Sequence, residues 1–147
     1  MYLGKKESVL NLDLVKKRLI EFEGMVLTPY KDKHGLLTIG VGHCLDRNGI
    51  TEEEALYLLS NDINTVIKRL DDNLPQWTTY PLKAQYVLLD MCFNMGWRTL
   101  STFRKFLKAL DEGDYLEAAK EIENSRYCEQ VGRRCLFNAE EIRSILE

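Results

Sequence analysis

The chain has 147 residues, of which 45% are apolar and 29% are charged, which is the length and balance of a single globular domain. Its 20 basic and 23 acidic side chains give a net charge of −3, which argues against the broad basic surface of a nucleic-acid-binding protein. No stretch reaches the ~18 apolar residues of a membrane-spanning helix. The N-terminal segment lacks the apolar centre of a secretory signal, so we expect the chain to accumulate in the cytoplasm.

The four cysteines are Cys44, Cys92, Cys128 and Cys135. They form no CxxC pair and stand at no zinc-ligand spacing with either histidine. We expect all four to be reduced thiols that are buried or half-buried. A bridge between Cys128 and Cys135 is the alternative in an oxidising compartment.

The first expected element is a helix that ends at Glu23. Apolar side chains recur at helical spacing up to Phe22, Asn11 is a residue type that caps helix starts, and Gly24 is the type that ends them. Residues 25–41 then change to a β-prone pattern around the turn KDKHG, which predicts a small antiparallel sheet.

The rest of the chain has helical patterns. Thr51 and Glu54 form a capping box that opens a helix of about twenty residues. Residues 82–95 are almost continuously apolar, which is typical of a buried helix. Further helices are expected from the STFRKF run to Gly113, from a cap at Asp114 through residue 127, and over residues 133–146.

These patterns predict an α+β fold that is mainly helical and forms one domain, residues 1–147. A small N-terminal lobe with the antiparallel sheet is expected over about 13–60. A larger helical lobe is expected over about 61–147, and the long helix after Thr51 is expected to join the two lobes.

Two carboxylates and a hydroxyl occur in the region of the predicted sheet. Asp32 lies in the predicted turn, nine positions after Glu23, and Thr38 lies on the returning strand. Hydrolysis of a glycosidic bond with inversion needs a protonated carboxyl at the leaving oxygen and a second group that positions water. The partial negative charge of a helix C-terminus disfavours a further negative charge on Glu23, which suits the acid. Without their context, however, such carboxylates are more often solvated or capping groups.

The context of these residues is specific. The stretch EGMVLTPYKDKHGLLTIGVGH, residues 23–43, resembles the signature of the bacteriophage-type lysozymes, the phage endolysin muramidases of glycoside hydrolase family 24. The run from CFNMG to ENSRY resembles the same family, so that the similarity covers residues 13–146. The resemblance implies a lysozyme-like fold in which Glu23 is the general acid. It implies that Asp32 and Thr38 hold the attacking water or stabilise the positively charged sugar.

A substrate groove is also expected, and the resemblance adds support for Asn94 and Met95 as part of it. Tyr30, Asn94 and Met95 are expected to contact the sugar units, and Tyr127 is a further candidate for that role. Arg134 is expected to bind in the same site and to pair with the catalytic Glu.

Three other residues of the motif have structural explanations. His43, which closes the IGVGH run, is expected to be a hydrogen-bonded structural histidine rather than a base. Gly40 and Gly42 are better explained by close backbone packing in a twisted sheet than by phosphate binding, because no helix follows at the spacing of a phosphate-binding loop.

We therefore expect a monomeric muramidase that hydrolyses the β-1,4 bond between N-acetylmuramic acid and N-acetylglucosamine in bacterial peptidoglycan, without a metal or organic cofactor. Neither nucleic acid nor a membrane is an expected partner. The expected setting is lysis of a bacterial host at the end of a phage cycle, after release from the cytoplasm by a holin-type protein. Two alternatives stay open, a lytic transglycosylase and a non-catalytic peptidoglycan-binding protein. The presence of both Asp32 and Thr38 favours water as the nucleophile.

Overall fold

The computed structural model describes residues 9–146. The prediction that the N-terminal segment is not a secretory signal concerns, in part, residues outside this described range. Contacts between residues divide the chain into two compact units, with the boundary after Ala55. The boundary falls within helix α4 (Glu52–Asn73), the same helix in which the sequence places the division between the lobes.

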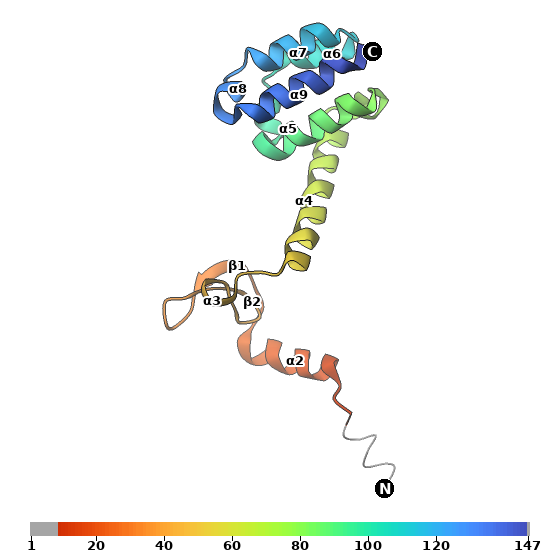
Figure 1. The fold of residues 1–147 in the computed structure, drawn as a ribbon. Coiled ribbons are helices and arrows are strands. Elements are labelled where there is room, and N and C mark those ends of the chain that lie inside the picture. The colour runs from red at the N-terminus through yellow and green to blue at the C-terminus, as the bar shows by residue number, and fades with distance from the viewer. Residues whose placement is uncertain (1–8, 147) are drawn as a thin grey trace. The chain divides into compact units, whose positions relative to one another are not determined.

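The smaller unit begins with helix α2 (Leu12–Glu23), whose two ends are fixed by neighbouring residues (Figure 1). The side-chain oxygen of Asn11 accepts two backbone N–H groups of the first turn, which otherwise have no partner within the helix. Gly24 has a φ of 76° and donates its N–H to a carbonyl of the last turn. Both predicted caps are confirmed, and Glu23 is the last residue of the helix.

A three-stranded antiparallel sheet follows, with strands β1 (Val26–Lys31), β2 (Leu37–Gly40) and β3 (His43–Cys44) in chain order. Tyr30 on β1 lies opposite Thr38 on β2, and Ile39 lies opposite His43. The predicted sheet is confirmed for its first two strands. The sequence does not predict β3 or the short helix α3 (Leu45–Asn48), because runs of two and four residues are too short for a hydrophobic period to be recognised.

Helix α4 begins at the predicted capping box. The backbone N–H of Glu54 donates to the hydroxyl of Thr51, and the Glu54 carboxylate accepts the N–H of Thr51 in return. The helix has 22 residues, which agrees with the expected length of about twenty.

The larger unit contains a series of helices, shown from green to blue in Figure 1: the 3-10 segment η1 (Pro75–Thr79), α5 (Leu82–Leu100), α6 (Arg104–Asp111), α7 (Tyr115–Glu123), α8 (Arg126–Val131), α9 (Arg133–Arg143) and the 3-10 segment η2 (Ser144–Leu146). The predicted cap of α7 is confirmed, because the Asp114 carboxylate accepts the N–H of Glu117. The helix expected to run on to residue 127 instead ends at Glu123, and α8 begins separately after Ser125.

The hydrophobic core lies in the larger unit. Its residues come from α4, η1, α5, α6, α7, α8 and α9, and the largest fully buried side chains include Leu88, Met91, Phe106, Ile122 and Ile142. Complete burial of a side chain of this size contributes about 2 kcal/mol. A mainly helical protein with one small antiparallel sheet is the α+β class that the sequence predicts.

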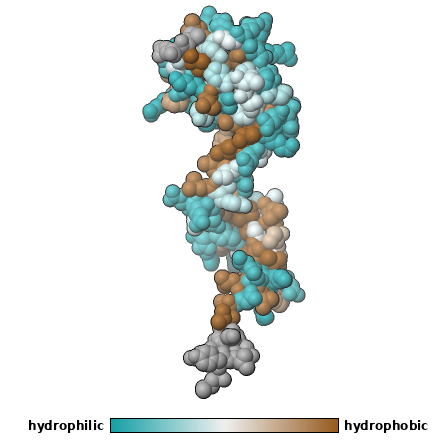
Figure 2. Space-filling view, turned by 90° about the vertical axis from the view of Figure 1, so that its right-hand side faces the viewer, coloured by the Kyte–Doolittle hydropathy of each residue, from teal (hydrophilic) through white to brown (hydrophobic). Residues whose placement is uncertain are grey.

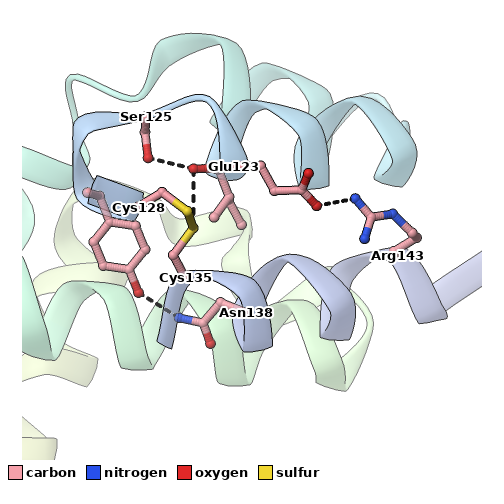
Figure 3. Close-up of a disulfide and its surroundings, with 8 residues drawn as sticks. Glu123, Ser125, Cys128, Cys135, Asn138 and Arg143 are labelled. Atoms are coloured by element: carbon pink, nitrogen blue, oxygen red, sulfur yellow. Dashed lines mark hydrogen bonds and ion pairs between the residues drawn. A yellow bond between two sulfur atoms is a disulfide. The ribbon is translucent and has the colours of Figure 1, made fainter. Parts of the chain in front are cut away.

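The prediction of four reduced cysteines is wrong for two of them. Cys128 on α8 and Cys135 on α9 form a disulfide with a Cα–Cα distance of 4.9 Å, which Figure 3 shows between the two helices. The chain turns at Gly132 between α8 and α9, which brings the two sulfur atoms together across a sequence separation of only 7. Cys44 and Cys92 are free thiols, and Cys92 is buried.

Hydrophilic and hydrophobic side chains both reach the surface (Figure 2). Exposed apolar residues of the smaller unit include Leu14, Phe22 and Leu27, while those of the larger unit include Tyr86 and Phe137. Within residues 9–146, no helix combines the length and the apolar composition that a bilayer span requires.

Candidate active site

Glu23 lies at the junction of helix α2 and the sheet, where its side chain meets the turn between β2 and β3. A Cβ atom added to Gly42 in that turn would lie 2.8 Å from Oε2 and 3.2 Å from Cδ of Glu23. The carboxyl group of Glu23 therefore lies directly against the backbone of Gly42. The sequence predicts close packing at Gly42 but gives no indication that its partner is the candidate acid.

Asp32 is fixed in the turn between β1 and β2 by backbone hydrogen bonds. Its Oδ1 accepts the N–H of His34 at 2.8 Å and the N–H of Leu36 at 2.9 Å. The backbone N–H of Asp32 also donates to the carbonyl of Leu36 at 2.9 Å. Since both side-chain bonds use Oδ1, Oδ2 has no hydrogen-bond partner within the described part of the chain.

These backbone bonds favour the ionised form of Asp32. The N–H of Leu36 contributes most to holding the pKa of this carboxyl below its usual value. Desolvation opposes it, and the N–H of His34 acts in the same direction as that of Leu36. Nearby positive charge on His34 and Arg47 adds to the shift. Asp32 is therefore an ionised carboxylate near neutral pH, which suits a group that accepts a proton or stabilises positive charge.

Thr38 is a buried residue at the centre of the small sheet. Its main chain pairs with Tyr30 on one side and with Cys44 on the other. The residue is only 3% exposed, and its hydroxyl donates a hydrogen bond of 3.0 Å to the carbonyl of Leu36. Because the hydroxyl hydrogen is used in this bond, the oxygen is left to accept hydrogen bonds from another group.

The two remaining candidates of the smaller unit are Tyr30 and His43, which have different surroundings. Tyr30 is half-buried and lies opposite Thr38 in the sheet. His43 forms a hydrogen bond of 2.5 Å between its Nε2 and the carbonyl of Gly49, as expected of a structural histidine. This bond joins β3 to the segment that follows α3 and occupies one of the two ring nitrogens.

Asn94 and Met95 line a cavity of about 860 Å³ in the larger unit, and Tyr127 lies on the same cavity wall. Phe103 and Tyr127 meet there edge to face, with their ring centroids 6.4 Å apart. Amide groups and aromatic rings of this kind suit the acetamido groups and faces of sugars. Three of the candidates from the sequence therefore share one cavity.

Arg134 bonds elsewhere in the larger unit, to a residue that the sequence does not identify as its partner. Its Nε and Nη2 donate to the two oxygens of Asp90 at 2.9 and 2.8 Å. Asn138 donates to the same carboxylate at 2.8 Å and to the hydroxyl of Tyr127 at 2.8 Å. The expected pairing of Arg134 with Glu23 stays a prediction.

The charge of Asp90 follows from these bonds. Partial burial opposes ionisation, but the hydrogen bonds from Arg134 and Asn138 outweigh it and hold the pKa of Asp90 below its usual value. Burial raises the pKa of Tyr127, the other partner of Asn138. The arginine and the wall of the cavity are thus connected through Asp90, Asn138 and Tyr127.

Sequence reasoning missed Asp90 and Asn138 because nothing local marks them. Asp90 is 44 positions from Arg134, within a helix whose apolar pattern indicates only burial. Among residues 9–146, no three His, Cys, Asp or Glu side chains are grouped so that they could hold a metal ion.

Comparisons with known proteins show which family the chain belongs to. A family model described as phage lysozyme matches residues 20–138. The chain is 29% identical over 149 residues to "Probable T4-type lysozyme 1" of Dictyostelium discoideum, covering 82% of this chain and 88% of the relative. It is 27% identical to "Probable T4-type lysozyme 2" of the same organism, covering 76% of this chain and 83% of the relative. It is also 29% identical to the "SAR-endolysin" of Escherichia phage Mu, covering 75% of this chain and 64% of that protein.

The matched region contains Glu23, Asp32 and Thr38 as well as the cavity residues of the larger unit. Because the family model covers most of its length, the chain belongs to the phage lysozyme family.

Proposed function

We propose that this protein is a muramidase that hydrolyses the β-1,4 bond between N-acetylmuramic acid and N-acetylglucosamine in bacterial peptidoglycan. The observation that carries the proposal is the joint anchoring of Asp32 and Thr38 on Leu36, next to a helix that ends at Glu23. Membership of the phage lysozyme family supports a glycosidase, and the relatives are named as lysozymes and an endolysin.

In the proposed mechanism Glu23 is the general acid. It donates its proton to the glycosidic oxygen as the bond to the leaving sugar breaks. Glu23 is the last residue of α2, and Gly24 caps the helix immediately afterwards.

Asp32 and Thr38 hold the attacking water in this proposal. The free Oδ2 of Asp32 accepts one proton of the water, and the Thr38 oxygen accepts a second hydrogen bond from it. Attack by a water held on the opposite side of the sugar from the acid inverts the anomeric centre. Because each group is already fixed by the backbone, little reorganisation is needed when the water attacks.

We propose that residues 1–147 form one lysozyme domain and that each unit contributes residues that bind the sugars. Tyr30 in the smaller unit and Asn94 and Met95 in the larger unit are proposed to contact the sugars. Arg134 is proposed to contact the substrate as well. No metal or organic cofactor has a step in this mechanism, and a monomer is sufficient for it.

Digestion of purified peptidoglycan in water enriched in ¹⁸O tests the reaction. Hydrolysis adds one ¹⁸O atom at each new reducing end, whereas a lytic transglycosylase yields an anhydro product without label. Borohydride reduction then identifies the sugar at the reducing end, which we expect to be N-acetylmuramic acid. Proton NMR of the fresh product is expected to show the inverted anomer.

Two variants provide the comparison. Glu23→Gln is expected to lower kcat by about 10²- to 10⁴-fold because it removes the proton donor. Glu21→Gln changes an exposed carboxylate of the same helix and is expected to retain wild-type activity. Equal activity of wild type and Glu23→Gln, or binding of glycan by the wild type without any turnover, contradicts the proposal.

We further propose that the enzyme lyses a bacterial host at the end of a phage cycle, reaching the wall from the host cytoplasm through a holin-type protein. The similarity to a protein named an endolysin supports this setting. Expression in a bacterial host with and without a co-expressed holin tests it. We expect rapid lysis only with the holin, and lysis at equal expression without it contradicts the proposed release.

A further inference from the structure

Two glycines near the β2–β3 turn have similar backbone conformations and different surroundings: Gly40 is the last residue of β2, and Gly42 lies in the turn itself. Gly40 has a φ of +68° and Gly42 a φ of +63°, both in the left-handed region that L side chains rarely adopt. A Cβ atom at Gly40 would meet no atom within 4 Å. A Cβ atom at Gly42 would meet Oε2, Cδ and Cγ of Glu23 at 2.8, 3.2 and 3.5 Å.

The first of these distances is too short for a real carbon atom, so one of the groups must move if Gly42 acquires a side chain. The contacting atoms are the far end of a long side chain with several rotatable bonds. Rotation about these bonds relieves the contact at low energetic cost. The fold can therefore accommodate a methyl group at Gly42, but the Glu23 carboxyl cannot stay where it is.

We infer that Gly42 is a positioning residue for the candidate acid: its lack of a side chain sets the place where the Glu23 carboxyl rests against the β2–β3 turn. The inference rests on the proposed function, since the carboxyl needs an accurate position only if it delivers a proton. A displacement of about 1 Å at a reacting group can lower a rate about 10²-fold. Gly42 thus acts through Glu23 and does not itself touch the substrate.

The matched variants Gly42→Ala and Gly40→Ala test this inference. Both place alanine at a similar positive φ and so carry a similar conformational cost, but only the first introduces an atom against Glu23. We expect Gly42→Ala to lower kcat at least about tenfold further than Gly40→Ala, with KM within about twofold of wild type, because the proton donor rather than sugar binding is disturbed. Equal kcat values in the two variants overturn the inference.

A double-variant cycle with Glu23→Gln asks whether the effect passes through the carboxyl. If Gly42 acts only through Glu23, Gly42→Ala has no further effect once Glu23 is Gln, and the two effects are strongly non-additive. Additive losses contradict the inference, because they show that the methyl group acts by another route. Should alanine prevent folding, Gly42→Asn and Gly40→Asn repeat the comparison, since asparagine tolerates a positive φ better.

A measurement without turnover separates this inference from the proposed function. The ¹³C chemical shift of the Glu23 carboxyl, assigned by its loss in Glu23→Gln, is expected to change in Gly42→Ala and to stay near the wild-type value in Gly40→Ala. If the wild type is inactive but this difference is still observed, the proposed muramidase function is overturned and the contact between Gly42 and Glu23 is supported. An active wild type without the difference overturns the positioning role alone.

Discussion

The carboxylate of Asp32 and the hydroxyl of Thr38 are held by the same residue, because the N–H of Leu36 donates to Asp32 Oδ1 and the carbonyl of Leu36 accepts from Thr38 Oγ1. The backbone N–H of Asp32 donates to that carbonyl as well. A shift of Leu36 therefore moves both side chains together. A pair that moves together can hold one water molecule between its free oxygen atoms without separate ordering of each group.

Thr38→Val tests the hydroxyl of this pair. Valine keeps the branched shape that suits β2, and the carbonyl of Leu36 keeps its bond from the Asp32 N–H, so we expect a loss of stability of only about 1 kcal/mol. The water loses one acceptor, and kcat is expected to fall about 10- to 100-fold. Steady-state kinetics and urea unfolding measure the two effects. Thr38→Ser keeps the hydroxyl and should retain most of the activity. If kcat falls equally in Thr38→Ser and Thr38→Val, the hydroxyl has no role in positioning the water.

Asp32→Asn removes the charge of the carboxylate and keeps its local bonds. The amide oxygen can accept the N–H groups of His34 and Leu36, so the turn is expected to fold as in the wild type. Loss of the proton acceptor is expected to lower kcat about 10²- to 10⁴-fold. A normal circular dichroism spectrum together with unchanged kcat excludes Asp32 as the base.

The acid limb of activity should report the same backbone bonds. Because the N–H of Leu36 and then that of His34 hold the pKa of Asp32 below its usual 3.8, its ionised form persists to lower pH than in an ordinary Asp. The charge is present above that pH and is lost as the pH falls through the folded-state pKa. Titration of the Asp32 carboxyl by ¹³C NMR measures the value directly, and a pKa above 3.8 contradicts the expectation.

The helix ends could be predicted from the sequence because neighbouring residues fix them. Asn11 bonds only to the first turn of α2, and Thr51 with Glu54 closes a capping box over three positions. Glu23, Asp32 and Thr38 could be identified for a related reason, since they lie within one short motif. Interactions of such short range leave a clear pattern in the sequence.

The contacts that the sequence could not predict join distant positions or depend on the course of a turn. Asp90 and Arg134 are 44 positions apart, and neither residue type indicates the other. The contact of Gly42 with Glu23 depends on the return of β2 toward the end of α2, which no local pattern records. The disulfide needs the break between α8 and α9, and the sequence does not specify how closely that break brings Cys128 to Cys135.

Reduction of the disulfide is expected to destabilise the end of the larger unit. Closing a loop with a sequence separation of 7 contributes about 2 kcal/mol, chiefly by restricting the unfolded chain. Urea unfolding of the wild type with and without dithiothreitol measures this difference. The variant in which Cys128 and Cys135 are both Ser should match the reduced wild type and should not respond to dithiothreitol. Identical midpoints for oxidised and reduced wild type show that the bridge contributes nothing.

The ion pair between Asp90 and Arg134 predicts a pH dependence of stability. The bonds from Arg134 and Asn138 hold the folded-state pKa of Asp90 below its usual 3.8, despite the opposing effect of burial. The unfolded chain therefore binds this proton more readily than the folded chain does. The stabilisation is fully present above the unfolded value and is lost as the pH falls through the folded value.

Asp90→Asn is accordingly expected to be less stable than the wild type at pH 7. The side chains of the pair are 39% and 36% exposed, so solvent screening limits the difference to about 1 kcal/mol or less. The difference should shrink below about pH 4, where the wild-type carboxyl becomes protonated. Urea unfolding at pH 7, 5 and 3 provides the measurement, with Asp62→Asn on the exposed surface of α4 as the control. A difference that stays constant over this range assigns the effect to packing rather than to the charge of Asp90.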